Sequence, residues 1–87
     1  MIQITESWRE ENNRLQKTYL FGDFESAMSF MQKAVAGISK MDHHPSWTNV
    51  YNKVEVTLTT HDAGNIVTDK DRALAELLDG IYLENSK

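Results

Sequence analysis

The sequence predicts an α+β fold, a two-layer sandwich in which two helices cover one face of a four-stranded antiparallel sheet. The predicted segments follow the order strand, strand, helix, strand, strand, helix. Apolar residues alternate with polar ones in the strand segments and recur every three or four residues in the helical segments. The chain has 87 residues and no repeat or linker rich in proline and glycine. Residues 1–87 are therefore expected to form a single domain.

A hairpin opens the predicted fold. A short strand is expected around Trp8, and the next turn contains Asn12 and Asn13, which tolerate the left-handed backbone that a tight turn needs. The second strand covers residues 14–21, and its apolar residues share one parity: Leu15, Tyr19 and Phe21. This alternation is typical of a strand.

A long helix follows the hairpin. Asp23 is its expected N-cap, and the helix is expected to end near Asp42, because Pro45 removes a backbone donor and favours extended backbone before it. The apolar residues that should cover the sheet recur at helical spacing: Phe24, Ala27, Met28, Met31, Ala34, Val35 and Ile38.

The second half of the chain repeats the pattern of hairpin and helix. A strand is predicted around Trp47, Val50 and Tyr51, and residues 53–60 alternate cleanly after a turn at Asn52. If that strand continued by one residue, His61 would lie with the polar residues, away from the helices.

The last helix is expected to begin at Thr68. Thr68 and Asp71 have the spacing of a capping box. The inner side of this helix should carry Leu74, Leu77, Leu78 and Ile81.

Composition excludes several classes of function. The formal net charge of −4 argues against binding to nucleic acid or to anionic membranes. The absence of cysteine excludes disulfides, thiol nucleophiles and zinc-thiolate sites, and fits a reducing compartment. Residues 1–6 contain no basic region and no apolar run, so no signal peptide or membrane span is expected. The expected location is the cytoplasm.

The histidines carry the functional signal. All three lie in one stretch, as His43, His44 and His61. An imidazole with a pKa near about 6.5 can give or take a proton at neutral pH, which points to acid/base chemistry or metal binding. Polar residues that close a helix are a plainer reading, because a cation there suits the helix dipole. Three imidazoles and an aspartate can also form a metal site, although adjacent histidines on one loop rarely point at the same ion.

A longer motif surrounds these histidines. The run His43-His44-Pro45-x-Trp47-x-x-Val50-Tyr51-Asn52-Lys53-Val54 is followed by His61, ten residues after Tyr51. With Phe21-x-Asp23-Phe24 before the long helix, it closely resembles the pterin-4a-carbinolamine dehydratase family, also called the dimerisation cofactor of a hepatocyte transcription factor. The resemblance covers the chain from Trp8 to Ile81.

The resemblance implies a reaction in tetrahydropterin recycling and tetrahydrobiopterin biosynthesis: 4a-hydroxytetrahydropterin loses water to give quinonoid dihydropterin. Hydroxide is a poor leaving group, so a general acid must protonate the C4a oxygen while a base accepts a proton from the pterin ring. The resemblance gives these roles to His43 and His61, and it implies no metal and no redox cofactor. The candidate substrate-binding residues are His44, Trp47 and Asp71. Asp71 would also orient or tune an imidazole, and Trp47 is more often a packing residue in such a place.

The resemblance also implies a homodimer or homotetramer, with Met28 and Met31 near a subunit contact. The chain departs from the family in having Ser39 where an acidic residue is usual, and Asp42 and Asp62 are candidates to replace that charge. The spacing from His61 to Asp71 is one residue longer than usual. An alternative function is a catalytically weak, dehydratase-like module that binds a partner protein, and the retention of all three histidines argues against it.

Overall fold

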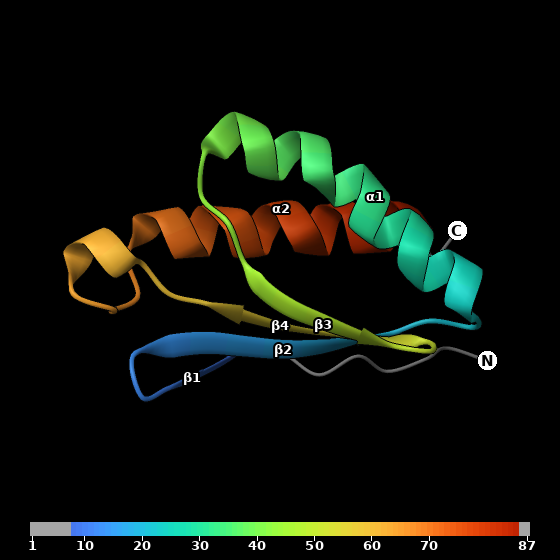
Figure 1. Ribbon diagram of the computed structural model, residues 1–87, viewed down its shortest axis with the longest axis horizontal. Coiled ribbons are helices and arrows are strands. Elements are labelled where there is room, and N and C mark those ends of the chain that lie inside the picture. Colours follow the sequence, from blue (N-terminus) through green and yellow to red (C-terminus); the bar gives the residue numbers. More distant parts are fainter. Residues whose placement is uncertain (1–7, 86–87) are drawn as a thin grey trace.

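The computed structural model describes residues 8–85 and has two layers (Figure 1). Four strands form one antiparallel sheet in the order β1-β2-β4-β3. Their bounds are β1 Arg9–Glu11, β2 Arg14–Leu20, β3 Ser46–Val50 and β4 Lys53–Leu58. Helices α1 (Phe24–Met41) and α2 (Asp69–Asn85) cover one face of this sheet. The predicted α+β sandwich and its ββαββα order are confirmed.

Residues 1–7, where the sequence predicts neither a signal peptide nor a membrane span, lie outside the described residues. Within the described part, neither helix has the length and apolar character needed to cross a membrane.

Both hairpin turns use left-handed backbone. Asn12 and Asn13 have φ values of 52° and 62°, as the first predicted turn requires. In the second turn Tyr51 has a φ of 52° and is 64% exposed, so it belongs to the turn and not to the predicted strand. The side-chain amide of Asn49 stabilises this turn by donating to the carbonyls of Tyr51 and Lys53, at 3.1 and 2.9 Å.

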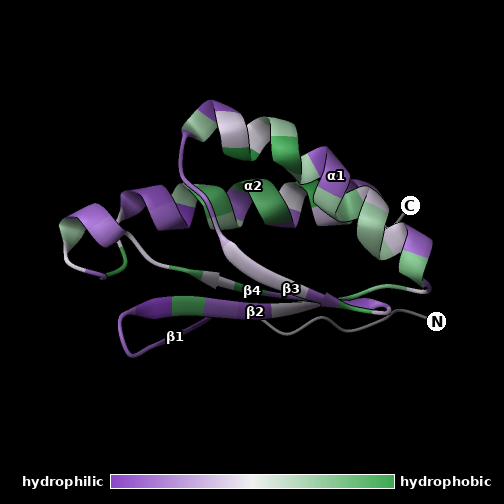
Figure 2. Ribbon diagram, in the orientation of Figure 1, coloured by the Kyte–Doolittle hydropathy of each residue, from purple (hydrophilic) through white to green (hydrophobic). Residues whose placement is uncertain are grey.

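The core lies between the sheet and the helices, where the apolar faces of both layers meet (Figure 2). An aromatic cluster fills one end of it. Tyr19 and Phe30 are completely buried, with ring centroids 4.8 Å apart, and Tyr82 lies 5.0 Å from Tyr19.

The buried face of α1 differs from the predicted stripe. It consists of Ala27, Phe30, Ala34 and Ile38. Phe24 and Val35, which the prediction placed in the stripe, are 43% and 51% exposed. They lie on the neighbouring side of the helix. Apolar residues at helical spacing can occupy more than one side of a helix, and packing against the rest of the fold decides which side is buried.

A polar cluster ties the first hairpin to α2. The carboxylate of Asp79 accepts hydrogen bonds from Lys17 Nζ and the Tyr19 hydroxyl, both at 2.6 Å, and from the indole nitrogen of Trp8 at 3.1 Å. Burial raises the pKa of Tyr19 far above its usual value, and the hydrogen bond to Asp79 raises it further. Tyr19 is therefore a neutral hydrogen-bond donor in the fold.

Candidate active site

The end of α1 positions His43. Asp42, the C-cap residue, takes a left-handed conformation with φ 53°, and its N–H donates to the carbonyl of Ser39 at 3.2 Å. This turn stops the helix at the predicted place. The His43 side chain is 11% exposed, so its ring is held against the protein while part of it stays open to solvent.

The start of α2 positions Asp71. Asp71 is the third residue of the helix, and its Oδ2 accepts the backbone N–H of Thr68 at 2.9 Å. The Thr68 hydroxyl in turn accepts the N–H of Lys70 at 3.3 Å. The bond from the Thr68 N–H to Asp71 is one half of the predicted capping box, with an aspartate where glutamate or glutamine is usual, whereas the Thr68 hydroxyl caps Lys70 and not Asp71. The Asp71 carboxylate is completely buried.

His43 and Asp71 meet across the two elements. Nε2 of His43 lies 2.6 Å from Oδ1 of Asp71. Burial acts to raise the pKa of Asp71, but the hydrogen bonds from His43, the Thr68 N–H and the Thr60 hydroxyl, together with the charge of His43, hold it below its usual value.

This ionised carboxylate can act as an acceptor, so Nε2 of His43 carries the proton of their hydrogen bond. Nδ1 is then the ring nitrogen that remains for acid/base chemistry. The contact with Asp71 thus leaves Nδ1 as the ring nitrogen of His43 that the carboxylate does not occupy.

Thr60 completes the surroundings of Asp71. Its hydroxyl donates to Oδ2 of Asp71 at 2.7 Å and lies 2.7 Å from the hydroxyl of Thr68. Thr60 was not among the site residues predicted from the sequence. The available signal was its parity, because Thr60 continues the inward-facing series Val54, Val56 and Leu58 of β4.

His61 follows Thr60 directly. β4 ends at Leu58, and His61 opens the short 3₁₀ helix η1 (His61–Ala63), so it is not a strand residue. It is exposed, in agreement with the expectation that it is not a core histidine. Thr60 pairs with Ile66 and thereby closes the loop of residues 61–65.

This loop accommodates the longer spacing between His61 and Asp71. Gly64 and Asn65 take left-handed backbone, with φ values of 90° and 62°. The N–H groups of Asn65 and Thr60 bond the carbonyls of Thr60 and Ile66, at 3.0 and 2.9 Å. The additional residue therefore leaves Asp71 in contact with His43.

The other predicted site residues are not joined to this network by side-chain hydrogen bonds. His44 is exposed, and within residues 8–85 neither His44 nor His61 forms a side-chain hydrogen bond. Trp47 is partly buried and packs against the core. Their predicted roles in catalysis and substrate binding remain predictions.

Position 39 is a serine where the family usually has an acidic residue, and neither Asp42 nor Asp62 supplies that negative charge to His43. Ser39, Asp42 and Asp62 are all exposed. The carboxylate that contacts His43 is that of Asp71. Among the described residues, no three histidine, aspartate or glutamate side chains are arranged to hold a metal ion.

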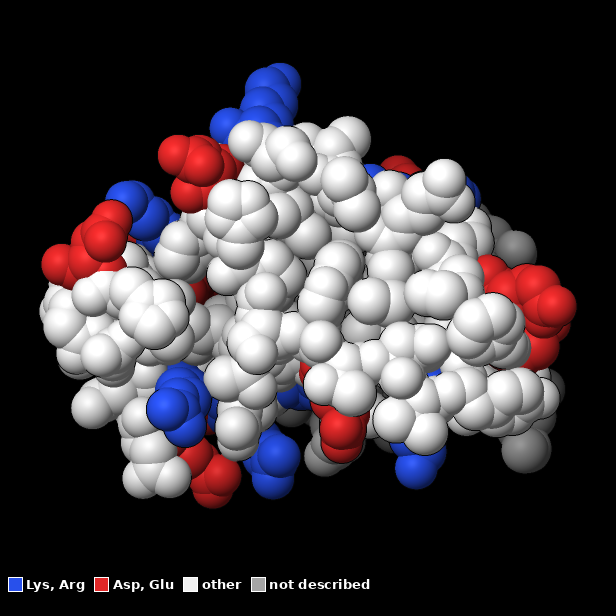
Figure 3. All heavy atoms as spheres, viewed as in Figure 1, with Lys and Arg blue, Asp and Glu red and all other residues white. Residues whose placement is uncertain are grey.

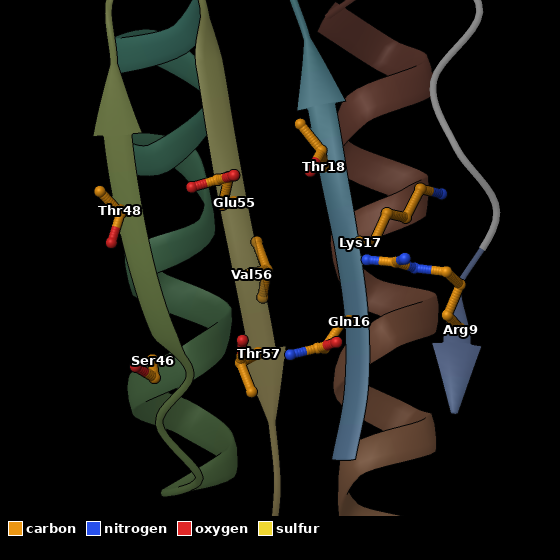
Figure 4. A pocket seen from close by; sticks show the side chains of 9 residues that line it. All are labelled: Arg9, Gln16, Lys17, Thr18, Ser46, Thr48, Glu55, Val56 and Thr57. Carbon is orange, nitrogen blue, oxygen red and sulfur yellow. The ribbon is translucent and has the colours of Figure 1, made fainter. Parts of the chain in front are cut away.

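A pocket of about 230 Å³ lies elsewhere, on the face of the sheet that the helices leave open (Figure 4). It is lined by Arg9, Gln16, Lys17, Thr18, Ser46, Thr48, Glu55, Val56 and Thr57. None of the predicted site residues lines it. On the side of the molecule seen in Figure 3, acidic and basic side chains are interspersed, without a large region of one sign.

Comparison with known proteins identifies the family. The sequence model of the family described as pterin 4 alpha carbinolamine dehydratase matches residues 1–81. The chain belongs to this family. The resemblance seen in the sequence is thereby confirmed.

Relatives within the pterin carbinolamine dehydratase family are close in length. A protein of Opitutus terrae, provisionally named a pterin-4-alpha-carbinolamine dehydratase, is 50% identical over 74 residues, which are 85% of this chain and 76% of the relative. A protein of Prochlorococcus marinus with the same provisional name is 45% identical over 78 residues, covering 90% of this chain and 81% of the relative.

Two solved structures share the fold. A transcriptional coactivator/pterin dehydratase of Brucella melitensis has a TM-score of 0.83 and 36% identity, over 90% of this chain and 84% of the other. A pterin dehydratase-like protein identified as a RuBisCO assembly factor in the alpha-carboxysome has a TM-score of 0.74 and 25% identity, over 88% and 90% of the two chains.

Proposed function

We propose that this chain is a single catalytic domain that dehydrates 4a-hydroxytetrahydropterin to quinonoid dihydropterin in tetrahydropterin recycling. The observation that carries the proposal is the 2.6 Å contact between Nε2 of His43 and the ionised, buried Asp71 in a member of the pterin carbinolamine dehydratase family. A buried carboxylate that orients a partly exposed imidazole is an arrangement suited to proton transfer.

The proposed reaction breaks the bond between C4a and its hydroxyl oxygen. One histidine, as the imidazolium, protonates the hydroxyl, which leaves as water. The other, as neutral imidazole, removes a proton from the pterin ring, so the product carries one water less than the substrate. His43 and His61 share these two roles, and the proton on His43 is exchanged at Nδ1.

The remaining candidate residues support the ligand. His44 and Trp47 are proposed to contact the pterin, because both lie close to His43 in the chain and keep part of their surface accessible. Asp71 is completely buried, so its role is exerted through His43.

A direct assay tests this function. The dehydration of a pterin-4a-carbinolamine also proceeds slowly without enzyme, so the rate must be measured against the uncatalysed rate at the same pH and buffer concentration. We expect a rate that rises in proportion to protein concentration. A rate equal to the uncatalysed one at micromolar protein would refute the proposal.

A second candidate function is a dehydratase-like module that binds a partner protein. The observation that favours it is the 25% identity to the dehydratase-like RuBisCO assembly factor, which shows that this fold occurs in an assembly factor. The same assay separates the two functions, since a pure binding module would leave the dehydration at its uncatalysed rate.

We also propose that the chain forms a homodimer or homotetramer in the cytoplasm. An apolar stripe on α1, formed by Phe24, Met28, Met31 and Val35, lies beside the buried face of the helix and is partly or largely exposed. Burial of such a stripe in a subunit contact would add to the small core of this domain.

A further inference from the structure

Thr60 occupies a place where an apolar residue would be expected. It follows Val54, Val56 and Leu58 on the inward-facing side of the chain, and it is 5% exposed. Valine has almost the shape of threonine and would bury no hydroxyl at this place. Thr60 and Asp71 are the buried polar residues of the described chain, and they contact each other.

The hydrogen bonds around Thr60 have one consistent direction. A hydroxyl has a single proton, and that of Thr60 is donated to Oδ2 of Asp71 at 2.7 Å. In the 2.7 Å contact between the two threonine hydroxyls, Thr68 must therefore be the donor. Thr68 in turn accepts the N–H of Lys70 at 3.3 Å. Successive donors thus lead from the first turn of α2 through both hydroxyls to the carboxylate.

The two carboxylate oxygens of Asp71 have different hydrogen-bond partners. Oδ2 accepts the Thr60 hydroxyl and the Thr68 N–H, at 2.7 and 2.9 Å. Oδ1 faces Nε2 of His43 at 2.6 Å. With Oδ2 held by two donors, the plane of the carboxylate is fixed, and Oδ1 remains aimed at His43.

We propose that Thr60 is a positioning residue for the dehydration: together with Thr68 it holds the Asp71 carboxylate, so that His43 keeps its proton on Nε2 and presents Nδ1 to the pterin. The assignment rests on the proposed function. Thr60 is also the residue before His61, so the buried Thr60 fixes the point at which the chain leaves the core toward the second predicted catalytic histidine. The network contacts the His43 side chain directly, and it is linked to His61 only through the backbone of Thr60.

Removal of the hydroxyl should change the proton-transfer step. Without Thr60, Asp71 keeps one donor on Oδ2, and its carboxylate can rotate away from His43. The loss of a hydrogen bond to the charged form raises the pKa of Asp71 relative to its present, lowered value. Within the described residues His43 is the titratable group in contact with Asp71, at 2.6 Å, so a change at the carboxylate acts directly on the imidazole.

The test compares Thr60→Val with Thr60→Ser and with Thr59→Val. Thr59 is the matched control, because it is the adjacent threonine and its hydroxyl donates to the carbonyl of Asn13 at 3.2 Å, outside the network. We expect Thr60→Val to lower kcat by about 10-fold, the scale of one hydrogen bond to a charged group, with little change in KM. Its pH–rate profile should also differ from that of the wild type, because the carboxylate that contacts His43 is held less firmly. Thr60→Ser should restore both, and Thr59→Val should match the wild type.

Nitrogen NMR of the His43 ring gives a readout that does not depend on activity. We expect the neutral ring to be the Nε2–H tautomer in the wild type and in Thr60→Ser, and a mixture of tautomers in Thr60→Val. If the wild type proves inactive as a dehydratase while these tautomers are found, the proposed function fails and the positioning stands. If the wild type is active, and Thr60→Val matches Thr59→Val in kcat, pH profile and tautomer, the positioning role is refuted.

A second variant guards against misfolding of Thr60→Val. Thr68→Val removes the donor to Thr60 but keeps the backbone N–H that bonds Asp71. It should therefore change kcat, the pH–rate profile and the tautomer in the same way as Thr60→Val, but by a smaller amount. A Thr68→Val protein that is folded and identical to the wild type in all three measurements would also overturn the proposal.

Discussion

Nε2 of His43 lies 2.6 Å from Oδ1 of Asp71, although the two residues are 28 positions apart in the sequence. The contact joins the C-terminal end of α1 to the first turn of α2. Because Asp71 is buried and ionised, it both fixes the orientation of the imidazole and directs its free nitrogen away from the carboxylate. The geometry of this pair therefore depends on how the two helices pack on the sheet.

Substitution of the histidines tests the proposed acid/base roles. We expect His43→Ala and His61→Ala each to lower kcat by at least about 100-fold, the usual scale for a general acid or base. His44→Ala should mainly raise KM, because its proposed role is to bind the substrate. Steady-state kinetics above the uncatalysed rate measure all three. Wild-type kcat in both His43→Ala and His61→Ala would exclude the mechanism.

The lowered pKa of Asp71 predicts a specific dependence of stability on pH. A carboxylate whose pKa is lowered by folding contributes fully above its unfolded pKa of about 3.9, and the contribution disappears as the pH falls through the folded value. We expect Asp71→Asn to reduce the free energy of unfolding by about 2 kcal/mol at pH 7. That difference should shrink below a pH of about 4. Urea unfolding between pH 3 and pH 7 measures it, and a difference that stays constant over this range would contradict the prediction.

Asp79 should matter for stability more than exposed carboxylates do. Asp79→Ala leaves the nearly buried Lys17 ammonium and the buried Tyr19 hydroxyl without their acceptor, so we expect a loss of about 2 kcal/mol in the free energy of unfolding. The control is Glu10→Ala, because Glu10 forms an exposed ion pair with Arg72 at 3.0 Å. Such pairs contribute about 0–1 kcal/mol. Equal losses in the two variants would show that Asp79 contributes no more to the free energy of unfolding than an exposed ion pair does.

The apolar stripe of α1 predicts self-association. We expect light scattering at micromolar concentration to give the mass of a dimer or tetramer, and Val35→Glu to reduce it, because a charge in an apolar contact must be desolvated. Ala36→Glu adds the same charge at an exposed position of the same helix outside the stripe. It should leave the mass unchanged. A monomeric wild type, or equal effects of the two variants, would argue against α1 as the subunit contact.

The sequence by itself determined the elements and their order. The alternation of residues 53–60, the Asn12 and Asn13 turn and the capping box at Thr68 each depend on interactions between residues a few positions apart. Such local signals act in the same way wherever the segment lies in the fold. The histidine motif likewise determined the family, because its residues and spacings are visible without the fold.

The tertiary structure decided which faces are buried and which side chains meet. Helical periodicity alone allowed Phe24 and Val35 into the core stripe, whereas packing buried Phe30 and left those two exposed. Asp71 was expected near the histidines, but its contact with Nε2 of His43, and therefore the role of Nδ1, depends on atoms 28 residues apart. The parity of residues 54–60 placed Thr60 on the inward side, but its hydrogen bond to Asp71 forms only when the sheet and α2 pack together. A local sequence pattern reports on one helix or strand. The site of His43, Asp71 and Thr60 combines the end of α1, the start of α2 and the residues after β4, so it exists only after these elements have packed together.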